Sequence, residues 1–469
     1  MKKWMLILLA MWLCGVSAVW AQSLECDVVV IGGGGAGLSA AIEAADRGAK
    51  VILLEKMAFL GGETGISGGT IQGAETVVQS KAGVADSRRD LFRYWMEAGH
   101  YKNDPELVRA VVDMSAANVE WLMKLGVAYE PRNLGLGGWT PVPRAHRTPG
   151  GGAELIKALE KAARDRGVTI LLGTKATELV SENGRVVGVR AEGKASLVKG
   201  KAVIIATGGF AANPEMVKQY APDYVDSLPI TTPGITGDGI RMAQALGAKT
   251  RGFGGVIGFR KVKDVPYGST IDGLGRQVIM YVNKAGKRFV DENAYYALIA
   301  EAIHNQGGVV YQIFDEKKRE ALGSAGQKDF DEALASGLIK QGATIEELAT
   351  QLGIPPEALA STLAEFNGNA AKGHDPVFWR DAATLVPLTT PPYYGLPVFH
   401  ANLGTLGGLV INTDAQVIHT SGEAIPGLYA AGSVTGGFFG DVYPAGGSAV
   451  AMAVATGRIA GANAASLVK

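Results

Sequence analysis

The sequence predicts an α/β fold in which a Rossmann-like dinucleotide-binding domain carries an inserted α+β domain. Three observations predict the first domain. A β-branched run, Val28–Ile31, is typical of a buried strand. Directly after it, glycines occur at the G-x-G-x-x-G spacing and open a helical stretch: Gly32, Gly34 and Gly37. An acid, Glu55, ends the next apolar run 18 residues beyond the last of these glycines. The motif alone is weak evidence, but in this strand–turn–helix context it is strong.

Each part of this pattern has a chemical reason. Glycines permit a tight turn and let the backbone approach a pyrophosphate, which then rests on the N-terminus of the following helix. The Glu55 carboxylate can accept hydrogen bonds from the hydroxyls of a ribose. The alternative is a glycine-rich turn in an ordinary α/β protein, and the context makes it much the weaker interpretation.

The composition agrees with a large two-domain protein. With 469 residues, 47% of them hydrophobic and 19% charged, the chain can bury a sizeable core. Lys and Arg together number 45, as do Asp and Glu, so the formal net charge is zero. This balance gives no indication of a nucleic-acid partner or of an anionic membrane surface as partner.

The N-terminus reads as a secretory signal peptide. Lys2 and Lys3 precede an apolar run that ends at a candidate cleavage site, Ala21, so residues 1–21 are expected to be removed on Sec-type export to the periplasm. A membrane anchor is the alternative, but the run is short for one. Cys26 is then the one cysteine expected in the mature protein, which excludes an internal disulfide. No C-x-x-C-H occurs, so no c-type haem is expected.

The remaining elements follow in order. Helices are predicted over residues 86–100, 104–125 and from 153 onward, and strands over 175–180, 186–191 and 202–205. A turn-forming tetrad, residues 283–286, lies between two apolar runs and predicts a hairpin. Thr344 and Glu347 have capping-box spacing, and Pro355 opens a further helix. Strand patterns return over 403–412 and 427–431, and a helix over 449–464 closes the chain.

The sequence pattern changes near residue 240, and we place a domain border there. We expect a signal peptide over residues 1–21 and a dinucleotide-binding domain in two segments, 22–240 and 390–469. The capping domain, which would also contact substrate, is expected between them, over residues 241–389.

Several motifs occur in one order along the chain. They are 32–37 (GGGGAG), Glu55-Lys56, 61–69 (GGETGISGG), His146-Arg147, 206–209 (ATGG), 236–239 (TGDG), Arg288-Phe289 and 427–437 (GLYAAGSVTGG). On these motifs the chain resembles the FAD-dependent fumarate reductase family, and more closely its exported flavocytochrome c-type flavoproteins, with urocanate reductases and 3-ketosteroid dehydrogenases. The resemblance covers residues 25–469. It implies a glutathione-reductase-type FAD domain, a mobile capping domain, and a substrate held between them against the flavin.

The resemblance also implies which residues bind FAD. The pyrophosphate and ribose would contact the glycine motif with Ala36, then Glu55 and Lys56. Further contacts are implied for Gly61, Gly62, Thr64, Ser67, Gly68, Gly69, Ala176, Ala206, Thr207, Gly208, Asp238, Gly432, Ser433, Ser448 and Val450. Family members with covalent flavin attach it through a histidine soon after the acid. No histidine occurs between Glu55 and Gly99, so noncovalent FAD is expected.

The charged residues by which fumarate and urocanate reductases clamp carboxylates are largely missing. Aligned with the family, the corresponding positions hold Phe259, Tyr296, Gly404 and Tyr443. Asp272 and Arg276 are at best the capping-domain acid and arginine, and Thr405 belongs to the loop of Gly404. A buried dianion without cations would lose several kcal/mol, so a dicarboxylate substrate is not expected. The loops around Thr405 and Tyr443 look like those of ketosteroid dehydrogenases, which favours a hydrophobic enone.

The expected chemistry joins hydride transfer at the flavin with proton transfer at the carbon α to a carbonyl. Tyr296 is the candidate proton group, with Tyr295 the rival if the alignment slips by one residue. A phenol has a pKa of about 10 and is a ready general acid at neutral pH. Tyr443 is the candidate hydrogen-bond donor to the carbonyl oxygen.

Two alternatives remain. One is a reductase of an unsaturated monocarboxylate such as fumarate, urocanate or acrylate, with Arg260 or Arg276 as the carboxylate partner. The other is a flavin electron carrier without an organic substrate. Export without haem suggests a separate redox partner, a cytochrome c or a quinone-linked protein, and slightly favours the reductive direction. Trp139 is a candidate for the pocket wall, whereas His146, Arg147 and His400 are expected to be structural.

Overall fold

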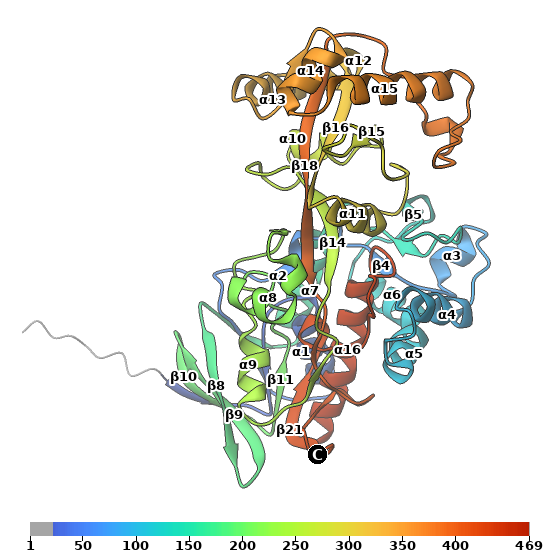
Figure 1. The fold of residues 1–469 in the computed structure, drawn as a ribbon. Coiled ribbons are helices and arrows are strands. Elements are labelled where there is room, and N and C mark those ends of the chain that lie inside the picture. Colours follow the sequence, from blue (N-terminus) through green and yellow to red (C-terminus); the bar gives the residue numbers. More distant parts are fainter. Residues whose placement is uncertain (1–21, 469) are drawn as a thin grey trace, which may run out of the picture.

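The computed structural model describes residues 22–468, and these form two parts joined by long strands (Figure 1). The lower part in the figure contains the dinucleotide-binding motif, and the upper part contains most of residues 256–405. The predicted signal peptide, residues 1–21, lies outside the described residues. Among the described residues, no helix is long and apolar enough to cross a membrane.

A six-stranded sheet forms the centre of the lower part. Its order is β20-β21-β11-β2-β3-β7, and all neighbours are parallel except β20 and β21. The strands β2, β3 and β11 are buried along their whole length, which explains their continuous apolar sequences. The bounds are β2 (Val28–Ile31), β3 (Val51–Glu55), β7 (Thr169–Leu172), β11 (Ala202–Ile205), β20 (Gln416–Ile418) and β21 (Ala424–Ala430).

Helices and a second sheet cover this central sheet. Helix α1 packs against both α7 and α16, and a four-stranded sheet, β1-β10-β9-β8, lies at the lower left in Figure 1. The helices are α1 (Gly35–Asp46), α2 (Gly62–Ile66), α3 (Val77–Lys81), α4 (Arg88–Ala98), α5 (Pro105–Asp113), α6 (Ser115–Lys124), α7 (Gly151–Asp165), α8 (Pro214–Tyr220), α9 (Asp238–Gln244) and α16 (Ser448–Ser466). The strands are β1 (Gln22–Glu25), β8 (Lys175–Glu182), β9 (Arg185–Glu192) and β10 (Ala195–Lys199).

The upper part is built on one long strand, β18, which pairs with β12, β14, β16 and β17. Figure 1 shows β18 and β14 running down from the upper part into the lower one. The strands are β12 (Leu228–Pro229), β14 (Val256–Lys261), β15 (Met280–Val282), β16 (Val309–Asp315), β17 (Lys340–Gly342) and β18 (Tyr393–Thr405). The helices are α10 (Thr270–Leu274), α11 (Tyr296–Asn305), α12 (Glu316–Glu320), α13 (Gly323–Ala335), α14 (Ile345–Leu352) and α15 (Pro356–Ala371).

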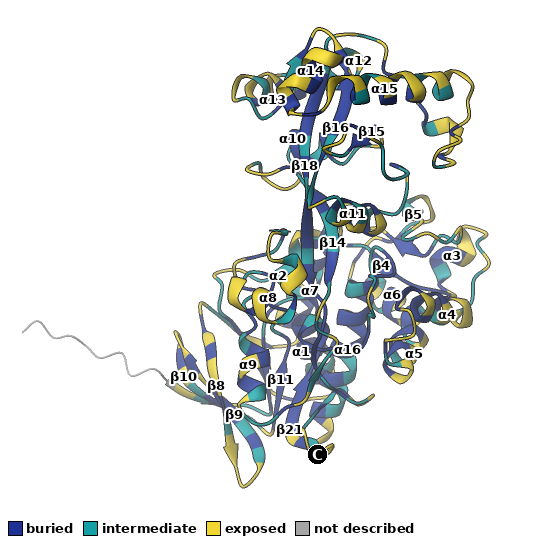
Figure 2. Cartoon of the chain, viewed as in Figure 1, coloured by how far each residue is buried: buried dark blue, intermediate teal, exposed yellow. Residues whose placement is uncertain are grey.

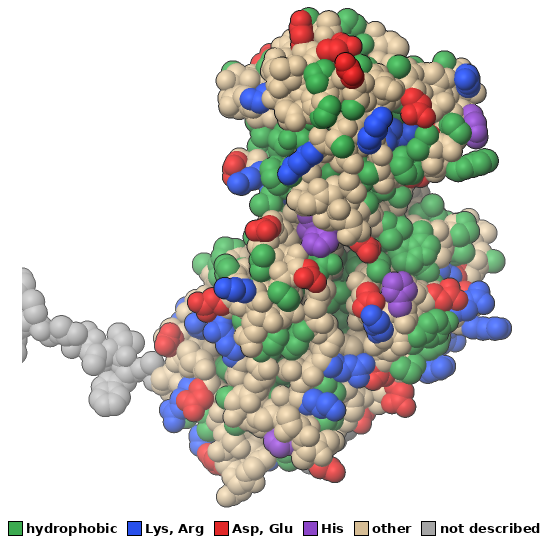
Figure 3. Space-filling view, viewed as in Figure 1, with side chains coloured by type: hydrophobic (Ala, Val, Ile, Leu, Met, Phe, Trp, Pro, Cys, Tyr) green, Lys and Arg blue, Asp and Glu red, His purple; other side chains and the backbone are tan. Residues whose placement is uncertain are grey.

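Each part has its own hydrophobic core. One cluster of buried side chains surrounds the central sheet, and a second lies between β15, β16 and the helices above them. Burial along β18 and β14 continues between the two parts, as Figure 2 shows. A small cluster of Ile257, Leu406 and Tyr443 packs with Tyr295 and Tyr296 at this junction. Hydrophobic side chains also gather near the narrowing between the parts on the face shown in Figure 3.

Most predicted elements form, with three exceptions. The hairpin expected around residues 283–286 is wrong, because β15 pairs with β16 instead and residues 288–290 are not a strand. The helix expected over 104–125 breaks at Met114 into α5 and α6. The strand expected over 403–412 is the end of β18 followed by β19 (Gly408–Leu409), which pairs with β13 (Thr250–Arg251). The domain borders at 240/241 and 389/390 stay predictions.

Candidate active site

A long cavity runs through the lower part and ends at its junction with the upper part. It contains about 1770 Å³ that no protein atom occupies, counting the space at its open end. Its walls come from the loop after β2, the α2 loop, the ends of β14 and β18, and the N-terminus of α16. The only described lysines or arginines that line it are Lys56 and Lys175.

Most of the predicted site residues line this cavity. They are Gly32, Gly34, Ala36, Glu55, Lys56, Gly62, Thr64, Ser67, Gly68, Ala176, Ala206, Thr207, Gly208, Asp238, Phe259, Tyr296, Gly432, Ser433, Tyr443 and Val450. The remaining ones do not line it: Gly37, Gly61, Gly69, Asp272, Arg276, Gly404, Thr405 and Ser448. The structure therefore brings residues from distant parts of the chain to one place, while their individual roles stay predictions.

One end of the cavity is formed by the glycine motif. Gly32 has a φ of +107°, and a Cβ there would lie 2.3 Å from the Ala206 carbonyl oxygen, so only glycine fits. A Cβ at Gly37 would lie 1.9 Å from the Gly32 carbonyl oxygen. At Gly34 the nearest protein atom would be 3.6 Å away, so the space that a side chain would fill belongs to the cavity. The motif thus holds the α1 N-terminus open toward a ligand.

Glu55 and Lys56 line the same end. The Glu55 carboxylate accepts hydrogen bonds from the backbone N–H groups of Gly33 and Met57, both at 2.8 Å. These bonds fix the carboxylate beside the glycine motif, and each oxygen keeps a lone pair for a ribose hydroxyl. Lys56 Nζ donates to Thr236 Oγ1 at 2.6 Å and to Asp238 at 2.7 Å. Asp238 therefore holds Lys56 in place at the cavity wall.

The residues present fit an FAD molecule. The α1 N-terminus has no side-chain cap and no acid in its first turn, so its N–H groups remain available to a pyrophosphate. Thr207 Oγ1, at the cavity wall, and Ser448 Oγ, at the first residue of α16, are buried without a protein hydrogen-bond partner. Such unpaired polar atoms beside a large cavity are expected where a polar ligand supplies the partner.

Tyr443 lies at the other end of the cavity, where α16 begins. Its hydroxyl accepts a hydrogen bond from the Ala449 backbone N–H at 2.9 Å. Because the N–H group occupies a lone pair of the oxygen, the phenolic proton is free to be donated elsewhere. Burial raises the pKa of Tyr443 to about 12, although the N–H groups of the α16 N-terminus oppose this. The phenol is therefore protonated at neutral pH.

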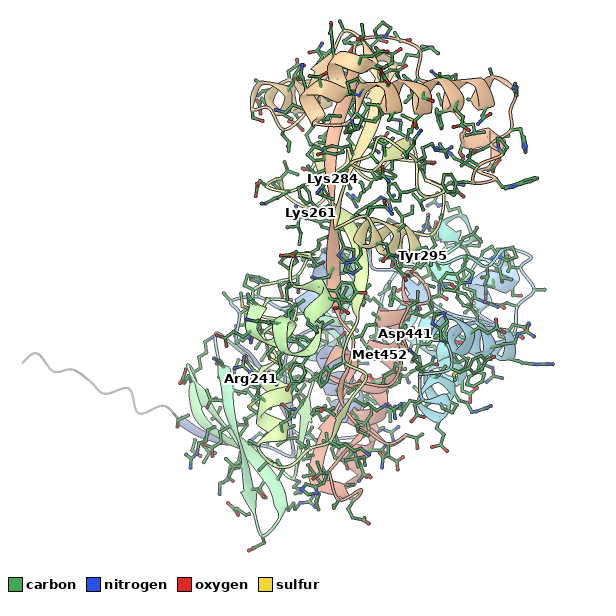
Figure 4. All side chains as sticks on the ribbon, viewed as in Figure 1. Arg241, Lys261, Lys284, Tyr295, Asp441 and Met452 are labelled. Carbon is green, nitrogen blue, oxygen red and sulfur yellow. The ribbon has the colours of Figure 1, made fainter. Side chains whose placement is uncertain are left out.

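Tyr296, the first residue of α11, reaches the same end of the cavity from the upper part. Burial raises the pKa of Tyr296 well above its usual value, and Tyr443 adds to the effect. Its ring packs on Phe259 and Tyr295 at centroid distances of 5.0 and 4.4 Å. Tyr295 does not line the cavity and instead packs against Trp139, at 5.6 Å. Figure 4 shows Tyr295 where α11 meets the lower part. This placement favours Tyr296 over its rival.

Phe259 and Tyr267 form the aromatic wall next to Tyr296, and Arg276 lies behind them. The Arg276 guanidinium stacks on both rings, at 5.7 and 5.0 Å, and pairs with the Asp272 carboxylate at 3.1 Å. Asp272 is fully buried and also accepts the N–H groups of Val262 and Gly268. Asp272 does not line the cavity, and its carboxylate holds the loop before α10, so its predicted contact with substrate stays a prediction.

The other candidate site residues form hydrogen bonds within the protein and do not line the cavity. Thr405 Oγ1 accepts the Phe210 backbone N–H at 3.0 Å and does not line the cavity. Arg260 donates from Nε to the Tyr281 hydroxyl and from Nη2 to the Arg276 carbonyl, whereas its Nη1 is buried without a hydrogen-bond partner; the residue does not line the cavity. The buried His146 ring contacts Thr76, and that of His400 contacts Ser227; both lie outside the cavity wall. The roles expected for the two histidines stay predictions.

The sequence analysis missed several cavity-lining residues, among them Tyr267, Lys175 and Glu63, and of these Glu63 is the one that brings a carboxyl group to the wall. Glu63 stands inside the glycine-rich α2 loop, between Gly62 and Thr64, which were both predicted. The signal that could have found it is a charged side chain within a loop of small residues. Burial raises the pKa of Glu63 to about 7, and the Thr231 hydroxyl opposes the shift.

Comparison with known proteins agrees with this geometry. A family model described as FAD binding domain matches residues 27–450. The NADH:fumarate oxidoreductase of Klebsiella pneumoniae is 34% identical over 94% of this chain and 47% of that protein, so the chain spans about half its length. The probable fumarate reductase of Shewanella frigidimarina is 35% identical, covering 94% of this chain and 74% of its own. The vinyl phenol reductase of Lactiplantibacillus plantarum is 32% identical, covering 94% and 96%.

Two solved structures show the same fold. The open conformation of a flavocytochrome c3 fumarate reductase matches with a TM-score of 0.78 and 34% identity, covering 95% of this chain and 78% of that one. The 3-ketosteroid-Δ4-(5α)-dehydrogenase of Rhodococcus jostii, in complex with 4-androstene-3,17-dione, matches with a TM-score of 0.78 and 30% identity, covering 96% and 99%. The predicted α/β fold and family are confirmed: the chain belongs to the FAD binding domain family, as a homologue of its fumarate reductases and flavocytochromes, with ketosteroid dehydrogenases as structural neighbours.

Proposed function

We propose that this protein is an FAD-dependent oxidoreductase that reduces, or forms, the C=C bond of an uncharged substrate conjugated to a carbonyl group or an aromatic ring. One observation carries the proposal. Tyr296 and Tyr443 line the cavity end that Phe259 and Tyr267 also line, and the cavity-lining lysines, Lys56 and Lys175, lie near Glu55 at the other end. This end can therefore donate hydrogen bonds to a neutral oxygen but supplies no cation from its wall.

The residues then divide the reaction between them. Bound FAD supplies or accepts the hydride at the carbon β to the carbonyl group. Tyr443 donates a hydrogen bond from its phenolic O–H to the carbonyl oxygen, keeps the proton, and stabilises the negative charge that develops there. Tyr296 gives a proton to the α carbon in the reductive direction and takes it back in the oxidative one. Burial keeps the Tyr296 phenol protonated at neutral pH, because it raises the pKa, and this is the state from which the reductive direction starts, so we favour reduction.

The named relatives support the general reaction and divide over the substrate. Curated relatives named for fumarate favour the unsaturated-acid alternative over the hydrophobic enone. Two relatives that match this chain over nearly their whole length are named for vinyl phenol and for a ketosteroid, which carry no carboxylate in those names. A third, the 4-oxocyclohexanecarboxylate 2-dehydrogenase of Sinomonas cyclohexanicum, is 28% identical over 92% of its length and is named for a carboxylate. No relative reported above is named as a non-catalytic electron carrier, so that alternative has no support from the comparisons.

The second candidate is therefore an unsaturated monocarboxylate reductase, and Arg276 is the observation in its favour. Its guanidinium lies on the outer faces of Phe259 and Tyr267, with about a quarter of the side chain exposed. A shift of either ring would bring this cation toward the cavity. Arg276→Gln should then weaken acrylate binding at least tenfold, whereas a neutral enone should bind the variant as it binds the wild type.

The proposed function is tested anaerobically. The FAD-loaded protein is reduced with dithionite, and flavin absorbance is followed as fumarate, acrylate, 4-vinylphenol or a 3-keto-4-ene steroid is added. Reoxidation by a neutral compound and not by fumarate is the expected result. Reoxidation by fumarate or acrylate alone would reject the neutral substrate and favour the second candidate. The same sample precipitated with acid should release its FAD, because we also propose that the cofactor is held without a covalent bond.

Localisation and redox partner belong to the same proposal. The N-terminal pattern of residues 1–21 supports export to the periplasm, where a cytochrome c or a quinone-linked protein would exchange electrons with the flavin. Cell fractionation with an antibody to the chain tests the export. Recovery of the full-length chain in the cytosol would overturn it.

A further inference from the structure

Glu63 is a carboxyl group in an otherwise uncharged part of the cavity wall. The Thr231 hydroxyl donates to Glu63 Oε1 at 3.1 Å, and no ion pair with Glu63 occurs among the described residues. Glycines leave room for the carboxylate. A Cβ at Gly404 would lie 3.1 Å from Glu63 Oε1, and one at Gly208 would lie 3.7 Å from Oε2. The side chain therefore lies against the end of β18.

Glu63 lies between Gly208, a predicted cofactor contact, and Gly404, at the end of the strand that leads to the aromatic wall. Ile230 and Thr232, on either side of Thr231, both line the cavity, and Ile230 N–H donates to the Asn402 carbonyl oxygen. Leu403, the next residue of β18, also lines it. Two residues earlier, Ala401 pairs in register with Phe259, which forms the aromatic wall. Glu63 and the aromatic wall thus flank the same strand.

The other titratable groups of the cavity do not neutralise Glu63. Lys56 is paired with Asp238, and Glu55 and Lys175 lie with them near the glycine motif. Tyr267, Tyr296 and Tyr443 line the substrate end as phenols with raised pKa values, so they are uncharged at neutral pH. With its pKa raised to about 7, Glu63 changes charge in the physiological range.

We propose that Glu63 selects ligands by charge: its carboxylate keeps carboxylate ligands out of the substrate end and leaves neutral ligands unaffected. The inference deepens the proposed function and rests on its neutral-substrate form. Two carboxylates in the same cavity repel each other, and the repulsion is strong because the protein walls lower the local dielectric and no ion pair with Glu63 occurs among the described residues. When Glu63 is protonated the repulsion disappears, so the discrimination should weaken at low pH.

A matched pair of ligands tests this inference by binding rather than turnover. Cinnamate and cinnamamide share a skeleton, and cinnamate is ionised throughout the range from pH 6 to pH 8. Their dissociation constants are measured on the oxidised FAD-loaded protein from the change in flavin absorbance. We expect the wild type to prefer the amide by roughly tenfold or more at pH 8, with a smaller preference at pH 6. Glu63→Gln should abolish this pH dependence and bind cinnamate about tenfold more tightly at pH 8.

Two further variants complete the test. Glu106→Gln removes an exposed carboxyl from α5 and should behave as the wild type. Thr231→Val removes the hydroxyl that lowers the pKa of Glu63, so the pH at which discrimination weakens should rise, even if Glu63→Gln fails to fold. An unchanged amide-to-acid ratio in Glu63→Gln, or an unshifted pH profile in Thr231→Val, would overturn the inference. Because ligand binding is measured without turnover, either result is independent of whether the proposed substrate is reduced.

Discussion

Replacing Tyr443 by Phe tests the proposed chemistry and one structural contact at once. The substitution keeps the ring, which is 5% exposed and packs against Phe439 at 5.2 Å. It removes only the hydroxyl that accepts the Ala449 N–H at 2.9 Å and that would donate to the substrate oxygen.

Two separate losses are expected from this change. Removing one donor to a developing oxyanion costs about 10²–10³ in kcat. Leaving the Ala449 N–H without its acceptor lowers the free energy of unfolding by about 1–3 kcal/mol. FAD binding should persist, because the glycine motif and Glu55 are untouched.

The assay is anaerobic reoxidation of the reduced flavin by the neutral substrate, with urea unfolding of the same preparation. Tyr129→Phe is the matched control, because the Tyr129 hydroxyl is buried without a hydrogen-bond partner and lies outside the cavity wall. That variant should keep its turnover and its stability. A Tyr443→Phe protein whose kcat stays within threefold of wild type would contradict the role given to this phenol.

Three further outcomes follow from the structure. Gly32→Ala places a Cβ 2.3 Å from the Ala206 carbonyl oxygen at a positive φ, so the variant should lose bound FAD or fail to fold, as flavin absorbance of the purified protein will show. Glu292→Gln weakens the buried ion pairs with Arg288 and Arg380, at 2.7 and 3.0 Å, and should cost about 3–5 kcal/mol in urea unfolding; a loss below 1 kcal/mol would contradict this. Because burial raises the pKa of Glu63 to about 7, the folded protein holds the Glu63 proton more tightly than the unfolded chain does. The free energy of unfolding gained in this way is full below pH 4.5 and is lost as the pH rises through about 7. Wild type should therefore lose up to about 3 kcal/mol relative to Glu63→Gln between these pH values, and parallel pH profiles of the two proteins would contradict the shift.

The cofactor end of the site was predictable because its signals are local. A buried strand, a glycine turn and an acid at the end of the next strand lie within 28 consecutive residues, from Val28 to Glu55. Their spacing follows from the geometry of one β-α-β unit, so Gly32, Gly34 and Glu55 could be assigned without knowing the rest of the fold. The family resemblance extended this to the later loops, and the cavity wall contains most of those residues.

The substrate end was decided by tertiary structure. Tyr296 and Tyr443 are 147 residues apart and meet only because α11 and the α16 N-terminus converge at the junction of the two parts. The sequence offered Asp272 and Arg276 as substrate contacts, but the fold pairs them behind the aromatic wall. The sequence analysis offered no role for Glu63. The charge of this residue depends on its burial against Gly404 and on the hydroxyl of Thr231, 168 residues later in the sequence. Local spacing determines where a dinucleotide rests, whereas the charge and protonation of a substrate pocket depend on which distant side chains the fold brings together and removes from water.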